Sequence, residues 1–528
     1  MKILKYILMS SLFLSLGSCD TDLNEVVYSD ITEDSYSYTD ANAAIGIVYA
    51  NMRSLFGHTN FYMVQETTSD EIVMPANPSG WDDGGIFKTL HLHTWNSENP
   101  QLINMWNVFY RGVINSNRLI SQLENDQIQL KSDQNKSQYI SEMRAARAFF
   151  YWLICDNFGD APLVTNPSTD LPQKTARKDI FKFIEKELKE SIPQLSEEKS
   201  SKTYGRFNKW AAKTLLANLY LNAEVYSGEN RWSDCLKEVN EIIASNKFSL
   251  ESSYKNNFIT NNENSKEIVF AIPFDENKAG GFFVQQFSWH AALRDKRATQ
   301  STPWGSGSAM GVSQFIDTYD PSDKRLEDSW LMGQQYALNG TTVLKGSYDK
   351  AGQPLIFTKD LPDGLFTGES EGYRQNKFEV KVGARFDLSN DFPFFRYAQV
   401  LLIKAECLLR LGQSAEAVKL VNQVRARNFS DEAKAKVTEE NLLGNSKYQY
   451  GLIKDYKLVD KGNTEVIKYG GLLDELGWEF AWEAQRRRDI IRYGVFTKKS
   501  WLSHKPQGND RITFMIPQAA VDANPNLK

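Results

Sequence analysis

The sequence contains little cysteine and histidine, with 4 Cys and 5 His among 528 residues. Cys155, Cys235 and Cys407 each lie in an apolar helical pattern, without CxxC or Cys/His spacing. A zinc site is therefore not supported. We expect these three thiols to be small buried side chains, rather than halves of a disulfide or reactive groups.

Positive charge is not in excess either, because 61 Lys and Arg stand against 66 Asp and Glu, a formal net charge of -5. Binding to nucleic acid or to an anionic lipid surface relies on a positive field, so neither is expected as a partner. The sequence also lacks GxSxG, HExxH, a Walker loop and a GxGxxG strand–helix unit. The hydrolase, metalloprotease and nucleotide sites that these motifs mark are not predicted.

Long apolar runs are missing except at the N-terminus, where residues 7–16 follow Lys2 and Lys5. This run is shorter than the roughly 20 residues that span a bilayer, so it is typical of an export signal. It ends in LGSC, which resembles a bacterial lipobox and implies a lipid on Cys19; an ordinary secretory signal is the alternative. We expect a signal peptide over 1–18 and, over 19–35, an acidic tether that joins the protein to a membrane through the lipid alone.

Apolar residues at helical spacing are abundant in two regions, roughly 137–250 and 394–495. From Tyr397 one helix continues to a stop at Gly412 and a second helix follows, and a similar pair begins at Gly205. Small residues on the facing sides are typical of a tetratricopeptide-type hairpin, which buries its faces only by stacking on others. The sequence predicts a mainly α protein in which such hairpins form an α-α superhelix.

Two stretches without a sustained period interrupt this pattern, roughly 70–107 and 275–391. The first contains two prolines and several glycines in VMPANPSGWDDGG, and the second is rich in glycine. Inserts of this size in a helical protein are usually functional loops or small subdomains. Short strands are expected at 267–272 and 377–382. Because strong helical units return after the second insert, we expect a single domain over 36–528.

Six segments follow one another along the chain, and no one of them is decisive alone. They are WNVFYRGVINSNRLI from Trp106, EMRAARAFFYWLICDNFGDAPLV from Glu142, GRFNKWAAKTLLANLYL from Gly205, FFRYAQVLLIKAE from Phe394, LGWEFAWEAQRRRDIIRYGVF from Leu476, and the closing FMIPQAAVDANPNL. In this order they resemble the SusD/RagB family, the surface lipoproteins of Bacteroidetes glycan-uptake systems.

The resemblance implies a helical frame of tetratricopeptide-like units that supports a variable glycan-binding face. It implies a protein on the outer membrane, facing the cell exterior, that captures oligosaccharides or polysaccharide without cleaving them. Import would then proceed through a SusC-like TonB-dependent transporter as the partner. No cofactor is implied, although the many Asp and Asn residues of the inserts leave a structural calcium open.

Sugar rings have apolar C–H faces and hydroxyl edges, so a site for them needs rigid aromatic faces beside short polar side chains. The inserts supply Trp81 between Asn77 and Asp82, Trp289 in FSWH, and Trp304 in TPWGSG, where glycines permit exposure. In the family, ligand-contacting aromatics fall in these two regions, and Trp304 is the best match. These five residues are our predicted carbohydrate site, and a place in the core is the alternative for each tryptophan.

Two other functions stay open, a surface glycoside hydrolase and a scaffold that only docks a partner. A hydrolase needs two opposed carboxylates roughly 5 to 9.5 Å apart, which the sequence cannot select. His91 and His93 would share one face of a strand but lack a recognisable third ligand, so no metal site is predicted. The run Arg486-Arg487-Arg488 is expected to form ion pairs and solvated heads on a helix. The core is expected to include Trp95, Trp106, Trp210, Trp478 and Trp482.

Overall fold

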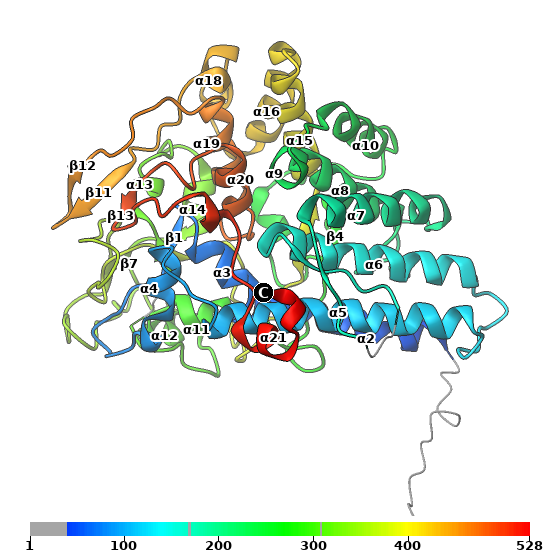
Figure 1. Ribbon diagram of the computed structural model, residues 1–528. Helices are drawn as coiled ribbons and strands as arrows, with labels where there is room; N and C mark the ends of the chain where they lie inside the picture. The colour runs from blue at the N-terminus through cyan, green and yellow to red at the C-terminus, as the bar shows by residue number, and fades with distance from the viewer. Residues whose placement is uncertain (1–39, 167–169, 307–308) are drawn as a thin grey trace, which may run out of the picture.

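The structure, a computed structural model, describes residues 40–166, 170–306 and 309–528. The predicted signal peptide, the tether over 19–35 and Cys19 lie outside the described residues. Long helices fill one half of the molecule, and loops with short strands fill the other (Figure 1). The helices of the first half are α2 (Ala41–Arg53), α5 (Pro100–Glu124), α6 (Lys136–Asn157), α7 (Arg177–Ser191), α8 (Lys209–Leu221), α9 (Ala223–Ser227) and α10 (Trp232–Ala244).

Helix α5 shows how the sequence sets these elements. The Asn99 side chain accepts hydrogen bonds from the N–H groups of Gln101 and Leu102, and Pro100 occupies the first turn. Both features favour a helix start. A Cβ atom at Gly112 would lie 2.3 Å from the Phe150 ring, so only glycine lets α5 and α6 approach this closely.

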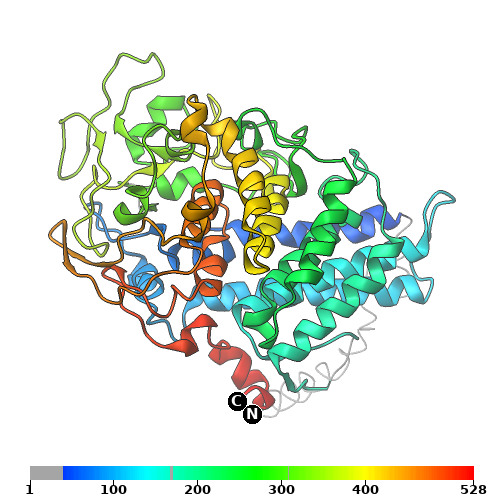
Figure 2. The same ribbon diagram turned by 90° about the horizontal axis from the view of Figure 1, so that it is seen from above.

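Helices α8 and α10 pack on each other as the hairpin predicted from Gly205. A second hairpin, α15 (Tyr397–Arg410) and α16 (Ser414–Arg425), packs against them (Figure 2). After α15, Gly412 has φ +79°, and the N–H groups of Gly412 and Gln413 bond to the carbonyls of Leu409 and Leu408. This is a Schellman ending, which a glycine at that position favours. Both hairpins and the mainly helical class predicted from the sequence are confirmed.

The remaining described helices are short. They are α3 (Phe61–Thr67), α4 (Ile86–His91), α11 (Val284–Ser288), α12 (Arg294–Arg297), α13 (Ser313–Ile316), α14 (Lys324–Ser329), α17 (Glu432–Ala435), α18 (Glu439–Leu443), α19 (Gly470–Phe480), α20 (Arg486–Arg492) and α21 (Gln518–Ala523).

Strand β4 (Ile268–Ile272) pairs antiparallel with β10 (Phe392–Arg396), which confirms the strand expected at 267–272. The strand expected at 377–382 is wrong, because none of these described residues is in a strand. Lys377 is instead buried and bonds to the Ala481 carbonyl and to Glu483. The other strands are β1 (Ile72–Val73), β2 (Ala161–Pro162), β3 (Lys174–Thr175), β5 (Met310–Gly311), β6 (Trp330–Leu331), β7 (Gly333–Gln334), β8 (Ile356–Phe357), β9 (Arg374–Gln375), β11 (Gly451–Lys454), β12 (Lys457–Asp460) and β13 (Trp501–Leu502).

The hydrophobic core is one cluster of described residues that runs from Ala41 to Leu527. It contains the three predicted buried cysteines, which are free thiols, and the five tryptophans expected there. Within the described ranges, no helix combines the length and the apolar character needed to cross a bilayer.

The basic run in α20 is buried, so the expectation of solvated heads is wrong. Its expected ion pairs are present, because Arg486 lies 2.7 Å from Asp70 and Arg488 lies 4.0 Å from Asp156. Arg487 donates to the Ile512 carbonyl. The run therefore fixes α20 to the first insert and to α6.

Candidate functional site

The two inserts meet through short backbone pairings. Strand β1 of the first insert pairs with β5 of the second. Ala76 then donates to the Leu365 carbonyl at 3.1 Å and accepts from the Thr367 N–H at 3.0 Å. These bonds hold the turn over 77–81 beside the loop that carries Trp304, although the two are distant in the sequence.

The turn over 77–81 is organised by a buried asparagine. Asn77 Oδ1 accepts hydrogen bonds from the Ser79 N–H at 3.1 Å and from the Ser79 hydroxyl at 2.6 Å. The Asn77 N–H donates to the Trp81 carbonyl at 3.3 Å. Asp82 follows and caps the next turn by accepting from the Gly84 N–H. The result is a fixed position for the Trp81 indole, which is half-buried against Phe87.

Trp304 is an exposed aromatic residue of this part of the surface, with 39% of its area exposed. Its backbone N–H donates to the Gln286 carbonyl at 2.7 Å. Its ring contacts His58, with centroids 5.0 Å apart, and Phe283 and Phe386, each 5.8 Å away. Phe386 is itself 37% exposed, so the two rings form an apolar surface with a rigid backing.

A pocket of about 90 Å³ lies between Trp81 and Trp304. Its walls are Met74, Ser79, Trp81, Phe287, Trp304 and Gly305. Gly305 has φ +62°, and a Cβ atom there would lie 3.0 Å from Ser79 Oγ. Glycine is therefore required at this position both by its backbone conformation and by the closeness of Ser79.

A buried carboxylate fixes the loops behind Trp304. Glu369 accepts hydrogen bonds from the N–H groups of Ser347, Tyr348 and Lys350, at 2.8, 3.0 and 2.6 Å. Its fourth partner is His290 Nε2, at 2.8 Å. Burial alone would raise the pKa of Glu369, but the three backbone donors and His290 outweigh it and hold that pKa below the ordinary value.

This clamp reaches the pocket through two further contacts. His290 Nδ1 accepts a hydrogen bond from the Ala292 N–H, so the ring proton is on Nε2. The Nε2–H group therefore donates the hydrogen bond to Glu369. The neighbouring Ala291 N–H donates to the Gly305 carbonyl at 2.9 Å. The loop that carries Trp304 is therefore fixed by the clamp, which reduces the ordering cost of binding.

The structure brings two of the five predicted site residues together around one pocket, Trp81 and Trp304. The prediction for Trp289 as an exposed platform is wrong, because it is 2% exposed and its indole N–H donates to the Gln375 carbonyl. Asn77 is 3% exposed and holds the turn, so its predicted contact with sugar is also not supported. Asp82 is exposed beside Trp81.

Sequence reasoning missed Ser79, His58 and Phe386. Ser79 and Phe386 carry no motif, and their positions depend on the pairing of the two inserts. The sequence did carry a signal for Trp304, which is followed by glycine. Trp289 directly follows α11, a helix that was not predicted from the sequence.

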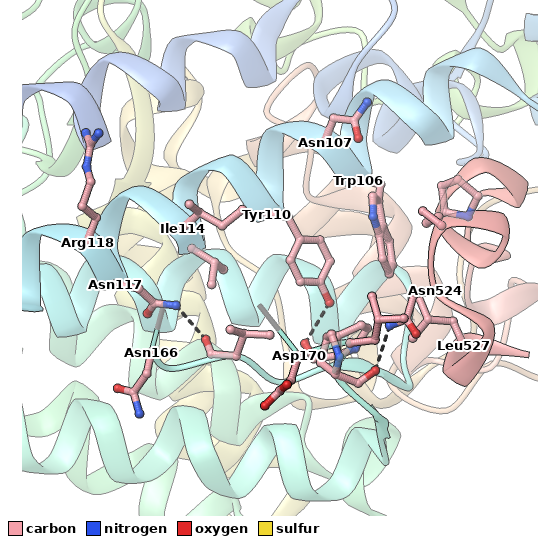
Figure 3. A pocket seen from close by; sticks show the side chains of 18 of the residues that line it. Trp106, Asn107, Tyr110, Ile114, Asn117, Arg118, Asn166, Asp170, Asn524 and Leu527 are labelled. Carbon is pink, nitrogen blue, oxygen red and sulfur yellow. Dashed lines mark hydrogen bonds between the residues drawn. The ribbon is translucent and has the colours of Figure 1, made fainter. Parts of the chain in front are cut away.

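A larger groove of about 940 Å³ runs along α5 to α21 and the C-terminus (Figure 3). It also offers aromatic rings, Trp106 and Tyr110. Three of its polar side chains are used within the protein: Tyr110 donates to the Pro162 carbonyl, Asn117 to that of Val164 and Asn524 to that of Pro172. Trp106 is also largely buried.

Acid–base and metal chemistry find little support in the described ranges. Burial raises the pKa of Glu66 to about 7 and that of its neighbour Glu71 well above the ordinary value, but each is 1% exposed and out of reach of a glycan. His91 ends α4 rather than lying in a strand. No set of three His, Cys, Asp or Glu side chains in the described chain could hold a metal ion.

Comparison with known proteins gives two family matches. The family described as "SusD family" matches residues 240–513, and the one described as "Starch-binding associating with outer membrane" matches residues 27–221. Among curated relatives, SusD-like protein P25 of Formosa agariphila is 25% identical, with 100% of this chain and 98% of P25 covered. The starch-binding protein SusD of Bacteroides thetaiotaomicron is 24% identical over 71% of this chain and 68% of its own length.

Among solved structures, surface glycan-binding protein A from Bacteroides thetaiotaomicron has the same fold, with a TM-score of 0.70 at 18% identity. The match covers 93% of this chain and 98% of that protein. The same protein in complex with laminarihexaose matches with a TM-score of 0.69 over 92% of this chain and 98% of its own.

Proposed function

Because the chain belongs to the SusD family, we propose that it is a surface glycan-binding lipoprotein that captures oligosaccharide or polysaccharide for import through a SusC-like TonB-dependent transporter. Related proteins are named as starch-binding and glycan-binding, and one is solved with laminarihexaose. The matched family is also described as associating with the outer membrane. The proposal includes attachment to the membrane through a lipid on Cys19. It also includes a location that faces the cell exterior, with the transporter as the partner.

The observation that carries the proposal is the exposed Trp304 beside the half-buried Trp81. An indole held rigidly against other rings offers a flat face that removes water from the C–H face of a sugar. The exposed Asp82 carboxylate directly follows Trp81 in the sequence and can accept hydrogen bonds from sugar hydroxyls. Each such bond contributes only about 1 kcal/mol net, so the affinity for a short oligosaccharide is expected to be modest.

We propose binding without cleavage, because the carboxyl pair with raised pKa values, Glu66 and Glu71, is sealed from any bound glycan. Native gels cast with a panel of polysaccharides test the binding, and slowed migration in at least one gel is the expected result. Unchanged migration in every gel would overturn the proposal.

Reducing-end release from the retained polysaccharide during a long incubation separates a binding protein from a glycoside hydrolase. We expect none, and steady release would favour the hydrolase. Trp304→Ala separates binding from scaffolding: retention should be lost with the variant. Retention that survives this substitution would place the glycan elsewhere on the protein, whereas transporter association without any retention by the unaltered protein would favour the scaffold.

A further inference from the structure

The pocket between Trp81 and Trp304 is smaller than a sugar ring. A cavity of about 150 Å³ holds a six-membered benzene ring. The pocket measures about 90 Å³, which by the same ratio holds about four heavy atoms. The pocket therefore fits a substituent of a sugar ring rather than the ring itself. Among common substituents, an acetamido group has four heavy atoms, a hydroxymethyl group has two and a hydroxyl group has one.

The chemistry of the walls favours the same substituent. Met74, Phe287 and the two indoles suit a methyl group, and none of the six described wall residues carries a charge. Ser79 supplies the one hydroxyl among the described wall residues, and this hydroxyl donates to Asn77 Oδ1 at 2.6 Å. The Ser79 oxygen is thus left as an acceptor, which matches an amide N–H and not a second acceptor.

We propose that this pocket receives the acetamido group of an N-acetylated hexosamine unit whose ring stacks on Trp304. The methyl group lies against Met74 and Phe287, and the amide N–H donates to Ser79 Oγ. Gly305 keeps the space open, since a Cβ atom there would meet Ser79 Oγ at 3.0 Å. This inference rests on the proposed function and names the substrate class of the same site.

The test compares methyl glycosides that differ only in the group at C2: N-acetylglucosaminide, glucoside and glucosaminide, then the matching galactosides. A D-fucoside, which is the 6-deoxy form of the galactoside, is added as the 6-deoxy arm. Saturation-transfer NMR gives both affinity and the group in closest contact. In at least one series the acetylated sugar should bind about tenfold tighter than its unsubstituted partner, the combined effect of one buried methyl group and one hydrogen bond. Its acetyl methyl should receive the strongest saturation, and the charged amine should bind no better than the parent sugar.

Two variants at one position separate the space from the hydrogen bond. Ser79→Leu fills the pocket, so the ratio of affinities between acetylated and unsubstituted sugar should fall to about one. Ser79→Ala keeps the space and removes the acceptor, so the ratio should fall to about twofold. The thermal midpoint of each variant checks that it is folded. The saturation of the acetyl methyl group is measured on the unaltered protein, so this part of the test does not depend on any variant.

The outcomes separate this inference from the proposed function. Three results would overturn the acetamido pocket: equal affinity within both series, tighter binding of the fucoside than of the acetylated sugars, or an affinity ratio that Ser79→Leu does not change. Retention in the polysaccharide gels would still support glycan binding in each case. Failure of both acetylated sugars to bind would overturn the acetamido pocket as well. Failure of every saccharide and polysaccharide would overturn the proposed function.

Discussion

Several carboxyl groups away from the proposed sugar site are buried, and burial shifts their pKa values. Asp474 is an example: its oxygens accept from the Ser446 hydroxyl and the Lys447 N–H, and its side chain is buried. Burial raises the pKa of Asp474 to about 7, with partial opposition from these two donors. The folded state therefore favours the neutral acid.

This pKa shift makes stability depend on pH. A carboxyl group with a raised pKa in the folded state contributes fully to stability below its unfolded-state pKa of about 4. This contribution to stability is lost as pH rises through the folded-state pKa of about 7. Asp474→Asn mimics the neutral acid at every pH, so its free energy of unfolding relative to the unaltered protein should increase from pH 4 to pH 8, by up to about 4 kcal/mol. Urea unfolding at several pH values measures this. A difference that stays constant with pH would contradict the assignment.

The Trp304 and Trp289 side chains show how far single residues could be predicted. A tryptophan followed by glycine could be predicted to be exposed, because glycine removes the side chain that would cover it. The burial of Trp289 could not, since it depends on the Gln375 carbonyl that accepts from its indole N–H, 86 positions away. The pocket itself could not be predicted either, because Ser79 and Gly305 meet only once β1 has paired with β5.

At the scale of elements, close helix contacts and backbone clamps hold the fold. The hairpins could be predicted because apolar spacing and a terminal glycine are local signals. The strand over 377–382 was wrongly predicted because an alternating pattern shows only which residues can be buried, not whether a neighbouring strand is there to pair with. Here Lys377 is buried by its ion pair with Glu483. The Glu369 clamp joins His290 to the loop over 347–350 and gives no local sequence signal.

Helix α5 packs closely on α6 at Gly112, and α2 offers a matched control. Gly112→Ala places a Cβ atom against Phe150 and should destabilise the protein by about 1–3 kcal/mol, the cost of overpacking. Gly46 lies exposed in α2 with nothing within 4 Å of its Cβ position, so Gly46→Ala should stabilise by roughly 0.5–1 kcal/mol. Opposite shifts of the urea midpoint are expected. Shifts of the same sign would contradict the close contact.

The Glu369 clamp predicts a local change in hydrogen exchange. Glu369→Gln replaces one acceptor oxygen by an N–H donor and removes the charge, so the amides of Ser347, Tyr348 and Lys350 should exchange at least tenfold faster. Amides in α15, which the clamp does not contact, serve as the reference and should change less. Uniform acceleration across both regions would indicate global destabilisation instead.

At the scale of the whole molecule, a buried ion-pair network joins the loop half to the helical half. Arg396 lies within 2.5 Å of Glu267, 3.1 Å of Glu479 and 2.7 Å of Glu483. Arg427 shares Glu267 and Glu479, and Lys377 of the second insert pairs with Glu483. Because each charge has a partner, the network tolerates burial that would otherwise be very costly.

Removing the cation at the centre of this network tests its role. Arg396→Met leaves Glu267, Glu479 and Glu483 short of a partner and should cost about 3–5 kcal/mol of stability. Lys182→Met removes a lysine whose pair with Asp179 is exposed, and it should change stability by less than about 1 kcal/mol. Thermal or urea unfolding compares the two variants. Similar small effects would show that the buried network does not hold the two halves together.

Capture of a glycan by the exposed indole is tested by isothermal titration of whichever oligosaccharide the gels retain, against the unaltered protein, Trp304→Ala and Trp232→Ala. Trp232 is a half-buried tryptophan on α10, in the helical half, and serves as the control. We predict at least a tenfold loss of affinity for Trp304→Ala, the effect of about 1.4 kcal/mol or more, and none for Trp232→Ala. Unchanged affinity in a correctly folded Trp304→Ala protein would contradict the assignment of the site.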